Sequence, residues 1–470
     1  MSVSPVSVSD EPLTPAGRLF LSPELDTIIH CIIRGKDPIN IDAVKQTIES
    51  SLMLQHPRFC SLLMRDRNGN QYWKRTEVDL DRHVIVINSE DDSGAGGEDD
   101  DEAAVNQYVA DLSVSTPLST DKPLWETHLL MAHRCAVFRI HHALGDGISL
   151  MSILITCCRK IDDPEALPTM ITKRDSGPKE GKWWDRLCSV LMMVCFTFVF
   201  VLEFVLRATW VSDRKTVISG GAGVELWPRK LATANCLPDS NPNEVCLLLN
   251  SDLSKTINDV FLAVVSSGIS RYLDHRSQQG LQKGLRITAE AMVNLRKPPS
   301  LEDLTNFIKN NTLLRLGNQF GVVLIPIYCR KSGDDPLQYL KQAKKTVDQK
   351  KHSLEAPFTY KVGDLVMSWL GPKYASVLNY RIVCNTTFTI SNVIGPQEQI
   401  TLAGNPIAYI RVNTSSLPHA LTMHMVSYAG RADIQLLVAK DIIPDPEFLA
   451  KCFEDALIEM KEAAIATAKC

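Results

Sequence analysis

The densest chemical signal in this chain is a short segment that combines two histidines, two glycines and an aspartate. The segment follows a run of strand-forming residues and reads Arg139-Ile-His141-His142-Ala-Leu-Gly145-Asp146-Gly147. Two glycines within three residues mark a sharp turn at which the backbone can approach a ligand closely. A histidine beside such a turn can project into a cleft, and its unperturbed pKa of about 6.5 suits a general base at neutral pH.

The two histidines are not expected to share one role, because adjacent side chains of an extended segment point to opposite faces. Three interpretations are open for His141 and His142. They could bind zinc with an aspartate, although adjacent histidines lack the spacing of known zinc motifs. They could be core histidines with satisfied hydrogen bonds, or one of them could be a catalytic base. Asp146 could orient an imidazole or lock the turn through an arginine.

The elements that must position this segment mix strands with helices on both sides of it. Apolar residues at helical spacing predict helices at 41–54, 148–161, 257–273, 337–350 and 446–466. Short runs rich in β-branched residues predict strands at 83–87, 124–130, 135–140, 287–295, 321–327, 388–393 and 434–438. Such a mixture in both halves of the chain indicates two α/β layers.

Composition excludes several classes of protein. The chain has 470 residues, of which 45% are hydrophobic and 22% are charged, and its formal net charge is −4. At roughly 150 residues per domain, this length suggests two or three domains. The slight acidic excess is not the footprint of a nucleic-acid-binding protein, so no nucleic acid partner is expected. The 13 cysteines are odd in number and form no CxxC pair, which favours buried thiols in a reducing compartment.

Two segments depart from this globular pattern. Residues 90–102 contain eight acidic side chains among 13 residues. A run of this kind repels itself, so we expect a disordered surface loop, with a site for a divalent metal or a basic partner as the alternative. Residues 187–206 are almost continuously apolar and could reach about 30 Å as a helix, the thickness of a bilayer core. Tryptophans and basic residues flank this segment, as at a membrane interface, and a buried core helix is the alternative.

Several motifs in the chain resemble one known family. HHALGDG at 141–147 matches the HHxxxDG motif of the CoA-dependent acyltransferase superfamily, which includes chloramphenicol acetyltransferases. Seven further motifs follow the order seen in the plant form of the wax ester synthase/diacylglycerol acyltransferase family: PLTP (12–15), PLWE (123–126), INDV (257–260), VNLR (293–296), GNQFG (317–321), SNVIGP (391–396) and LPHALT (417–422). The resemblance covers nearly the whole chain. The DFGWG signature of plant HxxxD acyltransferases is absent, which argues against transfer to phenolic or alkaloid acceptors.

The resemblance implies an O-acyltransferase that moves a fatty acyl group from acyl-CoA to a long-chain fatty alcohol, with diacylglycerol as a second acceptor. By motif position, His142 is the proton acceptor, His141 supports it, and Asp146 is a structural carboxylate. Arg296 would be the partner of Asp146, and Asn392 would hold the acyl donor or the developing oxyanion. Gly147 would keep the channel mouth open. No metal and no cofactor are expected, and acyl-CoA is a co-substrate.

The resemblance also implies the α/β (α+β) fold of the chloramphenicol acetyltransferase type, with two domains of mixed sheets flanked by helices. We expect an N-terminal domain at 1–175, a linker with one apolar membrane helix at 176–243, and a C-terminal domain at 244–470. Both halves must meet to form one tunnel, so a single membrane crossing between them would separate them. We therefore expect a monotopic anchor in the endoplasmic reticulum membrane, with both halves cytosolic and the plasma membrane as a second location.

Three rival functions are open at this stage. One is an acyltransferase of the same fold that uses a small soluble alcohol. The second is a catalytically silent lipid-binding or tethering protein, which a broken HHxxxDG motif would indicate. The third is a membrane scaffold whose acidic segment, 90–102, recruits basic partners.

Overall fold

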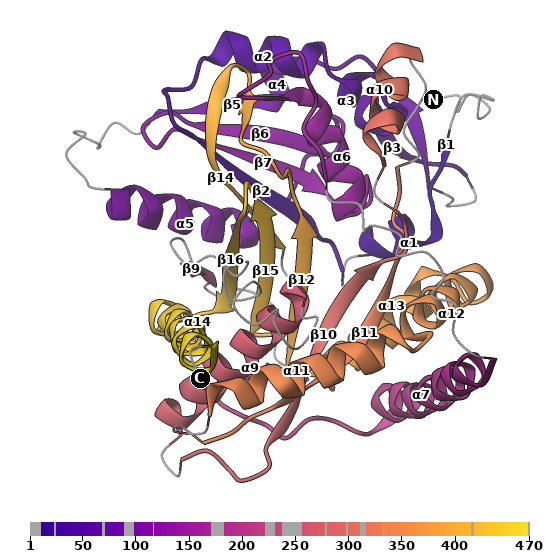
Figure 1. The fold of residues 1–470 in the computed structure, drawn as a ribbon. Coiled ribbons are helices and arrows are strands. Elements are labelled where there is room, and N and C mark those ends of the chain that lie inside the picture. Colours follow the sequence, from indigo (N-terminus) through magenta and orange to yellow (C-terminus); the bar gives the residue numbers. More distant parts are fainter. Residues whose placement is uncertain are drawn as a thin grey trace.

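The computed structural model arranges the chain in two lobes, each built on a mixed β-sheet with helices around it (Figure 1). It describes residues 11–22, 25–67, 71–88, 98–115, 117–170, 183–220, 231–236, 256–277, 280–297, 299–310, 316–331, 333, 335–414 and 418–468. This is the predicted α/β architecture, and most of the predicted helices and strands appear at the expected places. The helix expected at 41–54 is instead two helices, Ile41–Glu49 and Leu52–Gln55, which a turn at Ser50 and Ser51 separates. The helix expected at 148–161 ends earlier, at Cys157, and a short strand begins at Cys158.

The elements of the first 160 residues are β1 (Glu11–Pro12), α1 (Pro15–Phe20), β2 (Ile28–Gly35), α2 (Ile41–Glu49), α3 (Leu52–Gln55), η1 (Pro57–Cys60), β3 (Ser61–Arg65), β4 (Gln71–Arg75), α4 (Leu80–His83), β5 (Val84–Ile87), α5 (Glu98–Ser115), β6 (Trp125–Leu130), β7 (Cys135–His141), α6 (Gly147–Cys157) and β8 (Cys158–Lys160).

The later elements are α7 (Trp183–Thr209), β9 (Leu231–Cys236), α9 (Ile257–Arg276), β10 (Arg286–Asn294), α10 (Leu301–Asn310), β11 (Phe320–Tyr328), α11 (Pro336–Lys351), α12 (Glu355–Trp369), α13 (Pro372–Cys384), β12 (Phe388–Ile394), β13 (Ile400–Leu402), β14 (Asn405–Thr414), β15 (Leu421–Tyr428), β16 (Arg431–Ala439) and α14 (Pro446–Ala468).

The N-terminal sheet contains strands from both halves of the chain. The N-terminal sheet has the order β5-β6-β7-β2-β14-β13-β8, and the C-terminal sheet has the order β11-β10-β12-β15-β16-β9. Strands β13 and β14 therefore belong to the N-terminal sheet, where β14 pairs antiparallel with β2. Strand β9, which lies in the region 176–243 expected to be the linker, is an edge strand of the C-terminal sheet.

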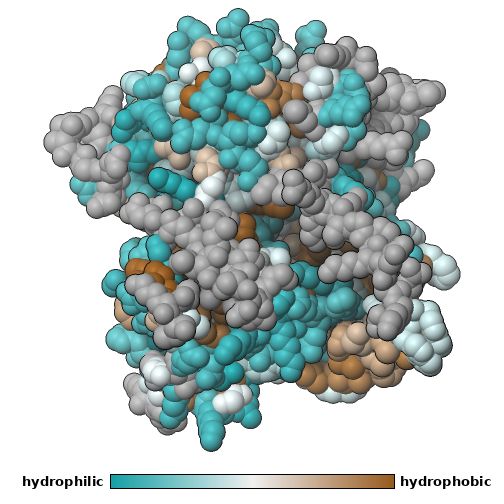
Figure 2. Space-filling model, in the orientation of Figure 1, coloured by the Kyte–Doolittle hydropathy of each residue, from teal (hydrophilic) through white to brown (hydrophobic). Residues whose placement is uncertain are grey.

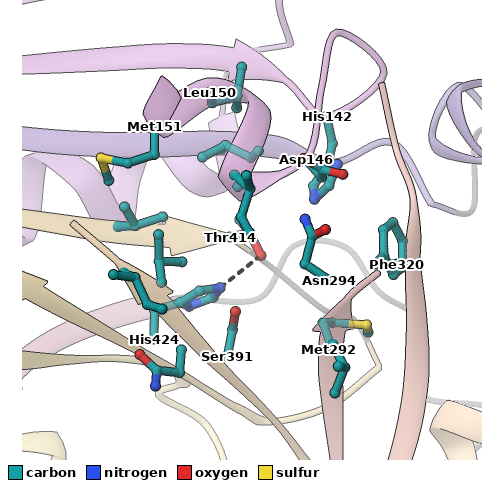
Figure 3. Close-up of a pocket in the computed structure, with 18 of the residues that line it drawn as sticks. His142, Asp146, Leu150, Met151, Met292, Asn294, Phe320, Ser391, Thr414 and His424 are labelled. Carbon is teal, nitrogen blue, oxygen red and sulfur yellow. Dashed lines mark hydrogen bonds between the residues drawn. The ribbon is translucent and has the colours of Figure 1, made fainter. Parts of the chain in front are cut away.

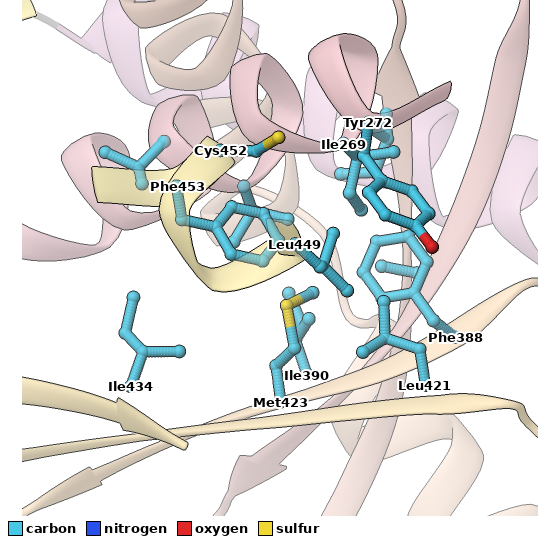
Figure 4. Close-up of a cluster of buried hydrophobic side chains, with 14 of the residues drawn as sticks. Ile269, Tyr272, Phe388, Ile390, Leu421, Met423, Ile434, Leu449, Cys452 and Phe453 are labelled. Atoms are coloured by element: carbon cyan, nitrogen blue, oxygen red, sulfur yellow. The ribbon is translucent and has the colours of Figure 1, made fainter. Parts of the chain in front are cut away.

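The core of the C-terminal lobe lies between its sheet and the helices α9, α11 and α14 (Figure 4). Helix α9 starts with a capping box, in which the backbone N–H of Thr256 donates to the Asp259 carboxylate at 2.6 Å. Gly268 of α9 faces the fully buried Phe453 of α14, and a Cβ at this glycine would lie 2.1 Å from the ring. The close approach of these two helices therefore requires a glycine at this position.

The segment 90–102, expected to be a disordered loop, is helical in its last five residues, which form the start of α5. Two carboxylates of this helical part pair with buried arginines from elsewhere in the chain. Asp101 lies 3.0 Å from Arg34, and Glu102 lies 3.1 Å from Arg411. The expectation is therefore wrong for this part of the segment, and the part before α5 lies outside the described residues. The sequence pattern missed these pairs because both arginines lie far away in the chain.

The apolar segment forms α7, which is longer than expected and packs on the C-terminal lobe along one face. Phe200 and Phe204 are buried against Leu324 of β11 and Ile382 of α13. Both rings also make edge contacts with Phe358 of α12, at centroid distances of 6.2 and 6.1 Å. Helix α7 is therefore part of the folded lobe along this face.

A buried arginine holds the C-terminal end of α7 in place. The Arg207 guanidinium donates to Asp213 at 3.1 Å, to the Thr288 hydroxyl at 2.7 Å and to the Asn385 carbonyl at 2.6 Å. It also lies 3.2 Å from Glu203, one turn earlier in the helix. The Arg207 side chain is only 3% exposed, so water does not reach it and these bonds satisfy its donors.

The opposite face of α7 is apolar and exposed, as the brown surface at the lower right of Figure 2 shows. By length and composition, residues Leu187–Thr209 form the one helix in the described part of the chain that could cross a membrane, and only 6% of its most apolar stretch is buried. The exposed large apolar side chains on it are Leu187, Val190, Leu191, Met192, Val194, Phe198, Val199, Leu202 and Val205.

We predict that Arg207→Leu lowers the free energy of unfolding by about 3 kcal/mol, because it leaves buried polar partners without their donor. Arg214→Leu is the matched control, since Arg214 is exposed and lies only seven residues further along the chain. Thermal denaturation of the two detergent-solubilised variants checks this expectation. Equal melting temperatures for the two variants would show that Arg207 does not anchor α7.

Candidate active site

A large cavity lies between the two lobes, and the HHxxxDG segment opens into it (Figure 3). Its volume is about 1180 Å³, above the range of roughly 300–1,000 Å³ typical of small-molecule sites. The N-terminal half lines it mainly with aliphatic residues of α2 and α6, and the C-terminal half with residues of β10, β11 and β12. The charged and histidine residues of the lining, which include His142, Asp146, Glu290 and His424, therefore lie in a mainly apolar wall.

His142 follows the last residue of β7 and is oriented by the other half of the chain. Its Nδ1 lies 3.1 Å from Oδ1 of Asn318, and the Asn318 side-chain amide donates to the His142 carbonyl at 2.9 Å. Because an amide oxygen only accepts, the Nδ1 proton must be the donor in the first bond. This assignment leaves the Nε2 lone pair available to a hydroxyl in the cavity.

Aromatic rings surround the His142 imidazole. Phe20 of α1 stacks on it at a centroid distance of 4.0 Å, and Phe320 of β11 lies 6.1 Å away. Burial lowers the pKa of His142 to about 4, because the charged form loses its hydration. The imidazole is therefore neutral, and able to accept a proton, at neutral pH.

His141 performs a different task, as the alternation of strand side chains predicts. Its Nε2 lies 2.8 Å from the Asp26 carboxylate, and its Nδ1 accepts from the backbone N–H of Ala143 at 3.1 Å. Both ring nitrogens are therefore used to hold the turn. His141 supports the position of His142 through the backbone and does not line the cavity.

Asp146 is the N-cap of α6 and links the two halves. One carboxylate oxygen accepts from the backbone N–H of Ser149 at 2.9 Å, and the other accepts from the backbone N–H of Gln319 at 3.0 Å. Its own N–H donates to the Gly317 carbonyl at 3.0 Å. The interpretation of Asp146 as a structural carboxylate agrees with this arrangement.

The described hydrogen bonds of Arg296 go to neighbours of Asp146, and its expected pairing with Asp146 stays a prediction. The guanidinium lies in the same cluster, 3.2 Å from the Gln319 side-chain oxygen and 3.4 Å from the Ser149 hydroxyl. It packs so closely on Gly317 that a Cβ there would lie 2.7 Å from Nη2. Arg296 therefore supports the 317–319 loop, while backbone N–H groups satisfy the carboxylate.

Asn392 and Gly147 both line the cavity, as expected from their motifs. The Asn392 amide donates to Asn258 of α9 at 2.7 Å, and its buried Oδ1 has no partner among the described residues. A Cβ on Gly147 would lie 3.6 Å from Val393, which is an ordinary contact. The geometry therefore places both residues at the cavity without a steric demand for glycine at position 147.

Several residues of this site were not assigned a role by the sequence reasoning. Asn318 lies within the GNQFG motif, but the motif does not predict its bond to His142. Phe20 and Asp26 lie outside any motif. His424 of β15 faces the cavity across from His142, and its Nε2 lies 3.4 Å from the Thr414 hydroxyl (Figure 3). Burial and the nearby His142 lower the pKa of His424 to about 4.

Comparison with protein-family models identifies two regions of the chain. The wax ester synthase/diacylglycerol acyltransferase catalytic domain matches residues 35–221, and the WS/DGAT C-terminal domain matches residues 316–461. Wax ester synthase/diacylglycerol acyltransferase 11 of Arabidopsis thaliana is 35% identical over 98% of this chain and 96% of its own length. Number 5 of the same series is 34% identical over 97% and 94%, respectively.

The chain belongs to the wax ester synthase/diacylglycerol acyltransferase family. It is accordingly an acyltransferase, and the family implies acyl-CoA together with an alcohol or acylglycerol as substrates. The matched catalytic region contains His141, His142 and Asp146, while Asn318 and Asn392 lie in the matched C-terminal region.

Solved structures of the same fold support this assignment of architecture. The wax ester synthase/diacylglycerol acyltransferase from Marinobacter aquaeolei VT8 is similar with a TM-score of 0.57, at 16% identity over 96% of this chain and 99% of that chain. A trichothecene 15-O-acetyltransferase from Fusarium sporotrichioides has a TM-score of 0.58 at 13% identity, over 97% and 95% of the two chains. At such low identity these likenesses concern the fold alone.

We predict that acyl transfer keeps a constant kcat from pH 8 to about pH 5 and declines near pH 4. The base must be unprotonated, and the lowered pKa of His142 keeps it so until that pH. Asn318→Asp places a carboxylate beside Nδ1, which favours the imidazolium, so the acidic decline should move up by a unit or more. Initial rates of CoA thiol release at each pH, with full recovery at pH 7 as a stability check, measure this shift.

Asn318→Leu is the matched control for the added charge. It removes the acceptor that selects the Nδ1–H tautomer, so kcat should fall by roughly 10- to 100-fold without an upward shift of the acidic decline. An unmoved decline in Asn318→Asp would mean that His142 does not set the pH dependence.

Proposed function

We propose that this protein transfers a fatty acyl group from acyl-CoA to a long-chain fatty alcohol, giving a wax ester, and to diacylglycerol as a second acceptor. His142 Nε2 takes the proton of the acceptor hydroxyl as that oxygen attacks the thioester carbonyl. The tetrahedral intermediate then collapses, the carbon–sulfur bond breaks, and the imidazolium returns the proton to the departing thiolate. The acyl group moves directly between substrates, so no acyl-enzyme forms on the chain.

The observation that carries this proposal is the free Nε2 of His142 inside a mainly apolar cavity of about 1180 Å³. A cavity of this size and lining suits two long alkyl chains better than a small polar alcohol, because burying a polar acceptor in an apolar wall costs free energy. The complete HHxxxDG segment, with every described polar contact in place, also disfavours a silent lipid-binding protein.

Three further residues complete the proposed site. The Asn392 side chain is placed at the cavity to hold the acyl donor or to stabilise the developing oxyanion. Arg296 and Asp146 keep the 317–319 loop against α6, so that Asn318 stays on His142. Gly147 leaves the cavity open at the start of α6. In this proposal the only co-substrate is acyl-CoA, and the chain uses neither a metal nor a cofactor.

We predict that membranes from cells without their own neutral-lipid acyltransferases gain a new product when they contain this protein. With labelled palmitoyl-CoA and hexadecanol they should form wax ester, and His142→Ala should lower the rate by about 100-fold or more. His133→Ala is the matched control, because His133 lies in the turn between β6 and β7, pairs with Asp101 and is not among the residues that line the cavity.

The acceptor is measured in the same assay by replacing hexadecanol with diacylglycerol, and the ratio of products gives the preference. Ester formation from a small soluble alcohol alone would contradict the proposal and favour that rival. No product from a well-expressed wild type would favour the silent lipid-binding protein.

We also propose that the exposed face of α7 lies in one leaflet of the endoplasmic reticulum membrane, with the plasma membrane as a second location, and that both lobes are cytosolic. Helices α12 and α13, which contact α7, carry the further exposed apolar side chains Trp369 and Tyr374. Strands β2 and β14, from before and after α7, pair in one sheet. A helix between them that crossed the bilayer once would place these strands on opposite sides.

We predict that Val194→Asp with Phe198→Asp prevents binding of the purified protein to liposomes. Full burial of each apolar side chain contributes roughly 1.5–3 kcal/mol, so losing two should weaken partitioning by about 100-fold. Ile458→Asp is the matched control, because Ile458 is exposed on α14. Flotation through a density gradient measures binding, and a double variant that floats like the wild type would contradict a role for α7.

A further inference from the structure

A buried carboxyl group in the wall of the cavity has no task in the reaction described above. Glu290 lies in the middle of β10, is only 1% exposed and is one of the residues that line the cavity. Successive residues of a strand alternate between faces, so Glu290 shares its face with Met292 and Asn294. Figure 3 shows Met292 and Asn294 below His142, with Asn294 nearer to it. Glu290 therefore lies further along the same wall.

One carboxyl oxygen of Glu290 is not satisfied by its neighbours. Oε2 is buried and has no hydrogen-bond partner among the described residues. On one side its strand neighbour is the apolar Leu324, and on the other side it is Thr389, whose hydroxyl pairs with His419 Nδ1 at 2.7 Å. Natural proteins rarely leave such a group without a partner, because an unpaired buried polar atom costs free energy. The carboxyl group of Glu290 therefore keeps hydrogen-bonding capacity that its described protein neighbours do not use.

The neutral acid is the form that suits this place. Burial raises the pKa of Glu290 to about 7, so a large share of the molecules carries the protonated group at neutral pH. A protonated carboxyl group both donates and accepts a hydrogen bond. A hydroxyl group does the same, so the two can form a reciprocal pair. A cation or an anion would instead need compensation that this apolar wall does not supply.

The strand sets how far this group lies from Asn294, which is the residue of this face nearer to His142. Four residues separate Glu290 from Asn294, which is about 13 Å along the strand. These four residues contain twelve backbone bonds, so an extended alkyl chain needs about ten to twelve carbons to cover the same distance. The ester carbonyls of a glycerolipid lie only a few bonds from the reacting hydroxyl. They are too close to that hydroxyl to reach Glu290.

We propose that Glu290 forms a polar subsite that binds a hydroxyl group in the middle of a long substrate chain. The protein would then prefer hydroxylated fatty acyl or fatty alcohol chains over plain ones of the same length. This inference rests on the proposed function, since it assumes that long alkyl chains occupy the cavity. It extends that function by naming a class of substrate, mid-chain hydroxylated lipids.

Two pairs of substrates test the subsite and identify which chain passes Glu290. The first compares 12-hydroxystearoyl-CoA with stearoyl-CoA, both with hexadecanol as acceptor. The second compares 1,12-octadecanediol with 1-octadecanol, both with palmitoyl-CoA as donor. In the wild type, kcat/KM should be higher for the hydroxylated member of one pair. The pair that shows the preference tells whether the acyl chain or the alcohol chain lies along β10.

Three variants separate hydrogen bonding from shape. Glu290→Leu removes the polar group and should lower the ratio of hydroxylated to plain kcat/KM by about tenfold. Glu290→Gln keeps a donor and an acceptor and should keep most of that ratio. Met292→Leu is the matched control on the same face of β10, and it should leave the ratio unchanged. Thermal denaturation of Glu290→Leu should give a melting temperature at or above that of the wild type, because an unpaired carboxyl group is removed.

Failure of the subsite and failure of the proposed function would give different results in these assays. Equal ratios in the wild type and Glu290→Leu for both pairs, with normal wax ester synthesis from plain substrates, would overturn the subsite alone. A preference for the hydroxylated chain that survives in Glu290→Leu would also overturn it. Absence of any ester from stearoyl-CoA and hexadecanol in the wild type would instead overturn the proposed function.

Discussion

The reciprocal hydrogen bonds between His142 and Asn318 join residues 176 positions apart, and the active site depends on them. The histidine comes from the end of a strand in one half, and the amide that selects its tautomer comes from a loop in the other half. Asp146 strengthens the same junction through the backbone of Gly317 and Gln319. The catalytic geometry therefore exists only when the halves are docked. Because β13 and β14 come from the C-terminal half but are strands of the N-terminal sheet, this docking is part of the fold.

The choice of a neutral amide at this position has an electrostatic consequence. A carboxylate on Nδ1 would stabilise the imidazolium, whereas Asn318 orients the ring without adding charge. In an apolar cavity between Phe20 and Phe320, an uncharged pair avoids the cost of burying ions before substrate binds. In the proposed mechanism, His142 rests as the neutral base and becomes charged only while the tetrahedral intermediate exists. At that moment the negative oxygen of the intermediate lies nearby and offsets the charge.

The sequence predicted what depends on local pattern and on motif order, and it failed where distant residues decide. The strand alternation separated the tasks of His141 and His142 correctly, and the glycine turn located α6. The motifs led to the family and its two-lobed fold. Acidic density at 90–102 predicted disorder, but Arg34 and Arg411, supplied by strands far along the chain, make part of this segment a helix. No local pattern could reveal these partners.

Helix α7 shows how the fold limits what a composition-based prediction can mean. Its length and hydropathy are those of a membrane-spanning helix, but two constraints oppose a crossing. Arg207 and the rings of Phe200 and Phe204 fasten one face to the C-terminal lobe. The chain before α7 provides β2 and the chain after it provides β14, which pair along Cys31–Val412 and neighbouring positions. A backbone hydrogen-bond ladder cannot form across a bilayer, so the exposed face of α7 can meet lipid only from the side on which both lobes lie. In the proposed orientation, a helix held in this way next to α12 and α13 brings the cavity close to the membrane in which long-chain acceptors would dissolve.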